Sequence, residues 1–117
     1  MSQTQILTRD ATGVTFANPT DPDYRVRFKT TSSQKSLNGV SVMNFVTEII
    51  VNDNVPVTLG NTSANDPVAI RIRVSGSLAS AARRDAILKS IASQLGGWAN
   101  ENVFAGFEPV TAPNIVE

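Results

Sequence analysis

The chain has 117 residues, ten basic and ten acidic side chains, no cysteine and no histidine, and a hydrophobic fraction of 41%. These figures fit one globular domain and exclude disulfides, thiolate metal sites and histidine-based catalysis. No apolar run reaches the roughly 18 residues that a membrane span requires, and the first residues show no secretory signal. We therefore expect no membrane partner, no cofactor and no enzyme activity.

The N-terminal residues predict a β-hairpin over 5–18. Short strand patterns at 5–8 and 14–17 flank a turn that ends in Gly13, whose backbone can adopt a positive φ. Residues 18–23 contain two prolines among Asn and Asp residues and predict a loop.

Two stretches, Tyr24–Thr31 and Val68–Val74, alternate apolar side chains with basic ones. A period of two is typical of a strand with one buried and one exposed face. The polar face of the two stretches carries Arg25, Arg27, Lys29, Arg71 and Arg73. Between them, residues 32–39 predict a polar connection that ends in a tight Asn38-Gly39 turn. Together they predict an antiparallel sheet over 24–75 with an apolar and a basic side.

The middle strand, Val40–Asn52, alternates less cleanly. The face that carries Met43 and Phe45 is the more apolar one and is assigned to the core. This assignment places Asn44 and Glu48 beside the basic residues. A β-bulge would reverse part of it, because a slip of one residue moves every side chain to the other face.

After this strand, residues 53–67 predict a long inter-strand loop, a type of segment that is usually functional or mobile. The period then changes to that of a helix over about 80–95, which Gly96 and Gly97 are expected to end. A second short helix is expected at about 100–106. The predicted fold class is α+β, in one domain over 1–117: an N-terminal hairpin, an antiparallel sheet and two C-terminal α-helices.

One helix of this length cannot cover the apolar face of a five-stranded sheet, and such a face needs a covering layer. The C-terminal aromatic side chains would suit packing across a partner sheet. These features predict an obligate homodimer with a continuous sheet and interlocked helices. A monomeric α+β sandwich, in which the helices fold back on their own sheet, stays open as the alternative.

The basic face has two interpretations. Charged strand faces are common, so an ordinary solvated surface is the simpler one. Binding of nucleic acid is favoured because arginine outnumbers lysine on these strands, and guanidinium groups fork phosphates well. Glu48 is the only acid expected to neutralise the face, and Thr31, Asn44 and Ser75 could bond to bases or riboses.

The order, lengths and charge placement of these elements resemble the coat proteins of single-stranded RNA bacteriophages, the leviviruses. The resemblance covers most of the chain: the hairpin Ile6–Asn18, the strands, the 53–67 loop and the C-terminal helices. It implies a dimer that assembles into an icosahedral virion shell in the host bacterial cytoplasm. It also implies that the inner sheet face binds single-stranded viral RNA and represses translation through an operator hairpin.

By position, the resemblance assigns RNA contact to Arg25, Arg27, Lys29, Thr31, Asn44, Glu48, Arg71 and Arg73. Arg27 and Lys29 fall where the best-known members use small hydroxyl and apolar residues to hold adenines. General packaging of RNA by charge is therefore favoured over recognition of one hairpin.

The sequence leaves two other functions open. A small non-viral RNA- or DNA-binding module with a basic sheet would stack bases on exposed aromatic side chains, whereas Phe28 and Phe45 are assigned to the apolar face. A monomeric adaptor without nucleic acid would remain a monomer in solution.

Overall fold

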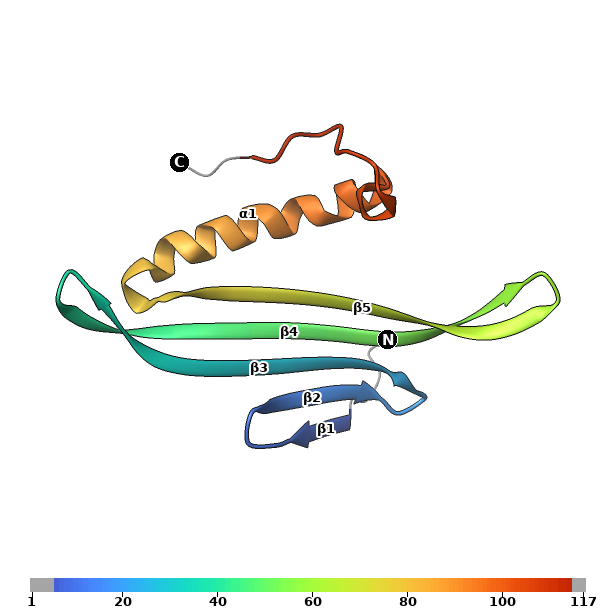
Figure 1. Ribbon diagram of the computed structural model, residues 1–117, viewed down its shortest axis with the longest axis horizontal. Helices are drawn as coiled ribbons and strands as arrows, with labels where there is room; N and C mark the ends of the chain where they lie inside the picture. The colour runs from blue at the N-terminus through green and yellow to red at the C-terminus, as the bar shows by residue number, and fades with distance from the viewer. Residues whose placement is uncertain (1–5, 115–117) are drawn as a thin grey trace. The chain divides into compact units, whose positions relative to one another are not determined.

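The chain forms a five-stranded antiparallel sheet followed by a helical segment, and the computed structural model describes residues 6–114 (Figure 1). It divides into two compact units, Met1–Ser77 and Leu78–Glu117. The sheet is a simple meander, with its strands in chain order. Its strands are β1 (Ile6–Arg9), β2 (Gly13–Asn18), β3 (Asp21–Leu37), β4 (Val40–Leu59) and β5 (Thr62–Ser77).

The predicted N-terminal hairpin is present as β1 and β2, and residue 5 lies outside the described residues. The loop predicted at 18–23 is much shorter, because β3 already begins at Asp21. The Asn18 side-chain oxygen accepts hydrogen bonds from the Thr20 backbone N–H at 2.9 Å and from its hydroxyl at 2.8 Å. These two bonds close a tight turn, as Asn side chains commonly do.

The polar connection predicted at 32–39 was wrong, except for its turn. β3 continues to Leu37, and the chain reverses at Asn38 and Gly39, whose φ angles are 51° and 83°. Positive φ at both central residues is the requirement of the tight hairpin turn that Asn-Gly predicts. The polar residues before the turn therefore belong to β3 and not to a loop.

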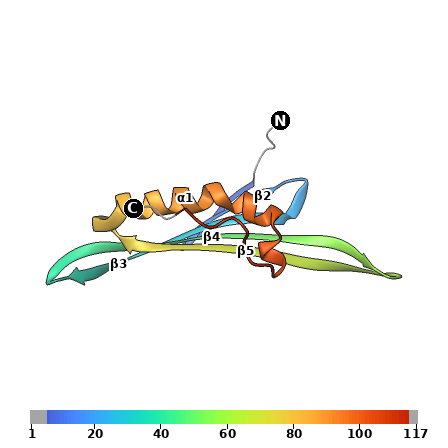
Figure 2. The same cartoon turned by 90° about the horizontal axis from the view of Figure 1, so that it is seen from above.

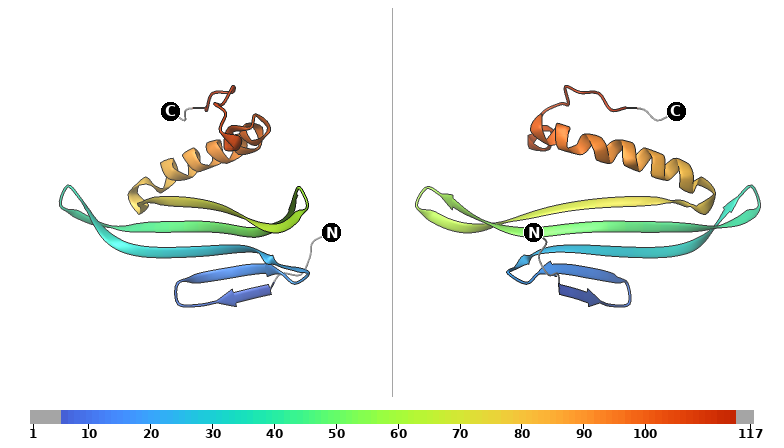
Figure 3. Two further views of the ribbon diagram at one scale, coloured as in Figure 1. Left: turned by 45° about the vertical axis from the view of Figure 1, so that its right-hand side comes forward. Right: turned by 180° about the vertical axis from the view of Figure 1, so that it is seen from behind.

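The long loop predicted at 53–67 was also wrong. β4 and β5 continue as a two-stranded ribbon that pairs Asp53 with Val68 and runs out to a turn after Leu59 (Figure 3). β3 stops pairing with β4 at the Arg25–Asn52 pair, so each ribbon strand has only one neighbour. A proline on such a strand can turn its nitrogen outward without losing a ladder hydrogen bond. Pro56 and Pro67 are therefore compatible with strands where a loop was predicted.

The helical unit contains one α-helix, α1 (Ala81–Asn100), preceded by a 3₁₀ turn. It runs without a break through Gly96 and Gly97, where the predicted end was wrong (Figure 2). Glycine in a helix interior costs roughly 1 kcal/mol. Contacts from the last turns of α1 to the following chain offset this cost: Trp98 donates its indole N–H to the Thr111 carbonyl oxygen at 2.9 Å.

The second predicted α-helix, at 100–106, is reduced to a 3₁₀ turn at Val103–Ala105. Asn102 and Gly106 border it with φ angles of 60° and 100°. A left-handed residue at each end stops an α-helix from propagating in either direction.

The described residues contain no buried hydrophobic side chain. Large apolar side chains are half-exposed or more on both units, among them Ile70 at 53% and Phe104 at 70%. On α1 an apolar stripe remains uncovered or only partly covered, and its members are Ile87, Leu88, Ile91 and Leu95. A chain of this size normally buries a core, and the described residues instead leave these large apolar side chains at least partly exposed.

Candidate nucleic-acid interface

The strand registers gather all the predicted RNA-contact residues on one face of the sheet. Directly paired residues of neighbouring strands lie on the same face. One row across the sheet pairs Lys29 with Glu48 and Glu48 with Arg73. The next row pairs Arg27 with Ile50, which in turn pairs with Arg71. We call this surface the basic face; it carries Arg25, Arg27, Lys29, Thr31, Asn44, Glu48, Arg71 and Arg73.

The register of β4 against β3 is unbroken from Val40 to Asn52, so no bulge reverses the predicted faces. Ser75, predicted to bond to bases or riboses, pairs with Val46 and so lies on the same side. Lys35 extends the basic face beyond the predicted residues, because it pairs with Val42, whereas Ser77, which pairs with Asn44, is buried. Alternation along the strand would have revealed Lys35, since it lies six residues after Lys29.

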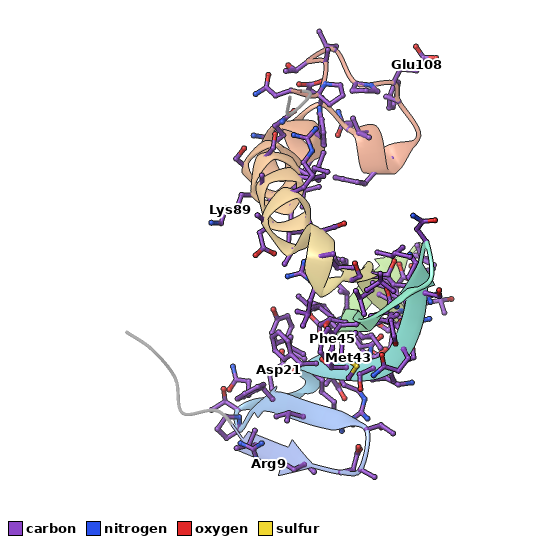
Figure 4. All side chains as sticks on the ribbon, turned by 90° about the vertical axis from the view of Figure 1, so that its left-hand side faces the viewer. Arg9, Asp21, Met43, Phe45, Lys89 and Glu108 are labelled. Atoms are coloured by element: carbon purple, nitrogen blue, oxygen red, sulfur yellow. The ribbon has the colours of Figure 1, made fainter. Side chains whose placement is uncertain are left out.

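The aromatic side chains of the sheet lie on the opposite face. Phe16 and Phe28 meet edge to face with ring centroids 5.9 Å apart. Met43 and Phe45 lie two residues apart and on one side of β4 (Figure 4). By alternation, no aromatic residue of the described strands faces the basic side.

The centre of the basic face is open and weakly paired. The Arg71 Nε lies 3.7 Å from a carboxylate oxygen of Glu48, and the Arg71 side chain is 68% exposed while that of Glu48 is 22% exposed. Arg73 forms no ion pair with another residue in the described part of the chain. One contact of 3.7 Å to a largely exposed arginine contributes little to stability, so both guanidinium groups remain able to bind anions.

Arg27, by contrast, is held by an acid that the sequence reasoning missed. Its Nη1 lies 3.0 Å from Asp10 Oδ2, and its Nη2 lies 3.1 Å from Asp10 Oδ1. Nη2 also donates to the Thr12 hydroxyl at 2.8 Å, and Nη1 to that of Thr15 at 3.0 Å. The prediction that only Glu48 neutralises the face was therefore wrong.

This network shifts both pKa values. Hydrogen bonds from Arg27 and then from Thr12 hold the pKa of the Asp10 carboxyl well below its ordinary range, and the Asp10 carboxylate raises the pKa of Arg27. From the sequence, Asp10 is expected only to form part of the turn between the two N-terminal strands. The signal that reveals its role is Gly13, which pairs with Lys29 and so brings the β1–β2 turn beside Arg27.

Across residues 6–114, no group of three or more acidic side chains could hold a metal ion. Within the same range, no helix is both long and apolar enough to cross a membrane.

No protein-family model matches the sequence, and no curated protein matches it significantly. Solved structures do resemble it. The chain of the virus-like particle of bacteriophage PQ-465 superimposes with a TM-score of 0.84 and 27% identity, covering 100% of this chain and 98% of that one.

Two more distant structures share the fold. The virus-like particle of bacteriophage ESE001 gives a TM-score of 0.72 at 12% identity, over 98% of this chain and 100% of that one. The virus-like particle of Beihai levi-like virus 32 gives 0.66 at 12% identity, over 93% and 90%. The resemblance to levivirus coat proteins that the sequence predicted is therefore confirmed, and it supports a structural role in a phage capsid.

Proposed function

We propose that this chain is a capsid protein that dimerises, assembles into an icosahedral virion shell and binds viral RNA on its basic face. One observation carries the proposal: the two faces of a single sheet expose side chains of opposite chemical character. One face gathers cations without aromatic groups, and the other gathers apolar side chains that a single copy leaves partly exposed.

Dimerisation follows from the apolar face and from the edge of the sheet. β5 is the last strand, so one of its edges carries backbone groups with no strand beside them. An unpaired edge readily accepts another strand, and a second copy would pair there symmetrically. The exposed stripe of α1 and the C-terminal aromatic side chains would then cover apolar surface of the partner.

RNA binding follows from the charge and chemistry of the basic face. Arg71 and Arg73 project from one strand about 7 Å apart, since a strand rises roughly 3.3–3.4 Å per residue. Guanidinium groups fork phosphate oxygens, and the lack of aromatic stacking platforms favours contact with the RNA backbone. Repression of translation through one operator hairpin would be a further use of the same face.

The same observation weighs against a small non-viral RNA- or DNA-binding module. Such modules stack bases on aromatic side chains of the sheet, and here the sheet aromatics lie on the other face.

Size-exclusion chromatography with light scattering and the 260/280 nm absorbance ratio tests the proposal. The expected product of expression in bacteria is a particle of megadalton size with high absorbance at 260 nm. A nucleic-acid-free species near the 12.5 kDa chain mass would contradict both the shell and the dimer. A small species that still carries nucleic acid would favour the binding module.

A further inference from the structure

Within the chain, the Asp10 carboxylate binds Arg27 with the geometry that a phosphate would use. Each terminal nitrogen of its guanidinium group contacts one oxygen of the Asp10 carboxylate and one threonine hydroxyl, at 2.8–3.1 Å. Two parallel contacts to the two oxygens of one anion form the fork geometry by which arginine also recognises phosphate. The Arg27 side chain is 26% exposed, against 68% for Arg71.

The β1–β2 turn fixes Asp10 in this position. Its Oδ1 accepts hydrogen bonds from the backbone N–H groups of Thr12 at 2.9 Å and Gly13 at 3.0 Å, and from the Thr12 hydroxyl at 3.0 Å. A Cβ at position 13 would collide with the Phe28 carbonyl oxygen, so glycine allows the turn to approach β3 this closely. The carboxylate is therefore preorganised and stays ionised, as its lowered pKa also indicates.

We propose that Asp10 acts as an internal substitute for an RNA phosphate at Arg27, which confines RNA contact to the part of the basic face that carries Lys29, Arg71 and Arg73. This inference rests on the proposed RNA-binding function and delimits its surface. The N-terminal hairpin thus contributes an acid that reduces RNA binding.

The physical consequence concerns the number of phosphates bound. A phosphate that approaches Arg27 meets a neutralised pair and must displace a carboxylate held by three hydrogen bonds of its own turn. At Arg73 it meets a cation without an ion pair to any described residue. Each phosphate that binds a cation releases counterions, so the salt dependence of affinity counts the contacts.

The test measures binding of a labelled oligouridylate to the full-length chain, freed of nucleic acid, over a series of salt concentrations. In Asp10→Asn an amide nitrogen replaces one carboxylate oxygen and the charge is lost, so Arg27 becomes able to bind RNA. We expect the slope of log affinity against log salt to steepen by about 0.7, the value for one added single-strand phosphate. Between about 50 and 200 mM salt, this adds roughly a 2.5-fold loss of affinity.

Two further variants complete the test. Asp10→Asn combined with Arg27→Gln removes both charges of the pair, so it should cancel the gain of Asp10→Asn and restore the natural affinity and slope. Arg73→Gln should make the slope shallower by about 0.7. If the double variant makes the slope shallower than that of the natural sequence, as Arg73→Gln does, Arg27 contacts RNA and the inference is overturned. If neither Arg73→Gln nor Asp10→Asn changes binding, the RNA-binding function itself fails.

Discussion

Different interactions stabilise the interior of each unit of the chain, yet both units leave apolar side chains exposed. The sheet unit is stabilised by four antiparallel ladders of backbone hydrogen bonds. In the helical unit, the end of α1 holds the following segment: Glu101, the residue that caps the helix, accepts hydrogen bonds from the backbone N–H groups of Val110 and Thr111 at 2.6 and 3.0 Å. Backbone and polar contacts define each unit, but no hydrophobic side chain among residues 7–114 is buried.

This comparison suggests that the apolar surfaces and the basic face have separate roles. The apolar stripe of α1 and the apolar side of the sheet would form a core only between copies, while the basic face would serve the RNA. Substitutions in the two units should then separate assembly from RNA packaging.

The largest expected effect is loss of assembly in Leu88→Asp. Leu88 is 40% exposed and lies in the apolar stripe of α1, which the proposed dimer would cover. An uncompensated buried charge costs about 3–5 kcal/mol, which lowers the association constant by roughly a hundredfold or more. Size-exclusion chromatography with light scattering would show the loss of dimers and particles.

Lys89→Asp is the matched control for this variant. Lys89 is the next residue along α1, is exposed, and extends outward from the helix (Figure 4). The Lys89→Asp variant should assemble normally, although it introduces the same aspartate side chain. Wild-type-like particles from Leu88→Asp would show that this stripe is not an interface.

A smaller effect, restricted to cargo, is expected for Arg71→Ala combined with Arg73→Ala. Both side chains are exposed on the basic face, so folding and assembly should be retained. Loss of two phosphate contacts should make the salt slope of RNA binding shallower by about 1.4 and reduce packaged RNA. The 260/280 nm absorbance ratio of purified particles measures this reduction.

Arg9→Ala combined with Lys89→Ala removes the same charge elsewhere. Arg9 pairs with Val14 and so lies on the opposite side of the sheet from the basic face, and Lys89 lies on α1. These particles should keep their absorbance ratio. An unchanged ratio in the Arg71 and Arg73 variant would contradict the assignment of RNA to the basic face.

The faces of the strands could be predicted from the sequence because alternation is a local property. Arg71 and Arg73 alternate with β-branched residues, and the register confirms the face on which each lies. The ends of the elements could not be predicted, because they depend on contacts distant in sequence. The ribbon tolerates Pro56 because no third strand needs its nitrogen.

The Asp10–Arg27 pair escaped prediction for the same reason. Seventeen residues separate the two, and only the register that places Gly13 beside Lys29 brings them together. The helix continues past Gly96 and Gly97 because Trp98 and Glu101 bond to a segment about ten residues further on. Local propensity cannot report such contacts.

The smallest expected effect concerns pH and the C-terminal segment of the helical unit. Hydrogen bonds from the backbone of Thr111, and then of Val110, lower the pKa of Glu101 below its ordinary value of 4.5. Its stabilising contribution is therefore fully present above pH 4.5 and is lost as the pH falls through the lowered pKa of the folded state. Trp98, the single tryptophan, donates to the same segment and reports its detachment by fluorescence.

Glu101→Gln should reproduce at pH 7 part of the fluorescence change that acid causes in the natural chain. Its amide keeps one acceptor oxygen but loses the charge that strengthens both hydrogen bonds. Glu108→Gln makes the same chemical change in an exposed side chain that forms no hydrogen bond to any residue of the described range, and it should leave the fluorescence unaltered. If both variants behave like the natural chain across the acid range, the carboxylate of Glu101 does not hold the segment, and the indole hydrogen bond of Trp98 must suffice.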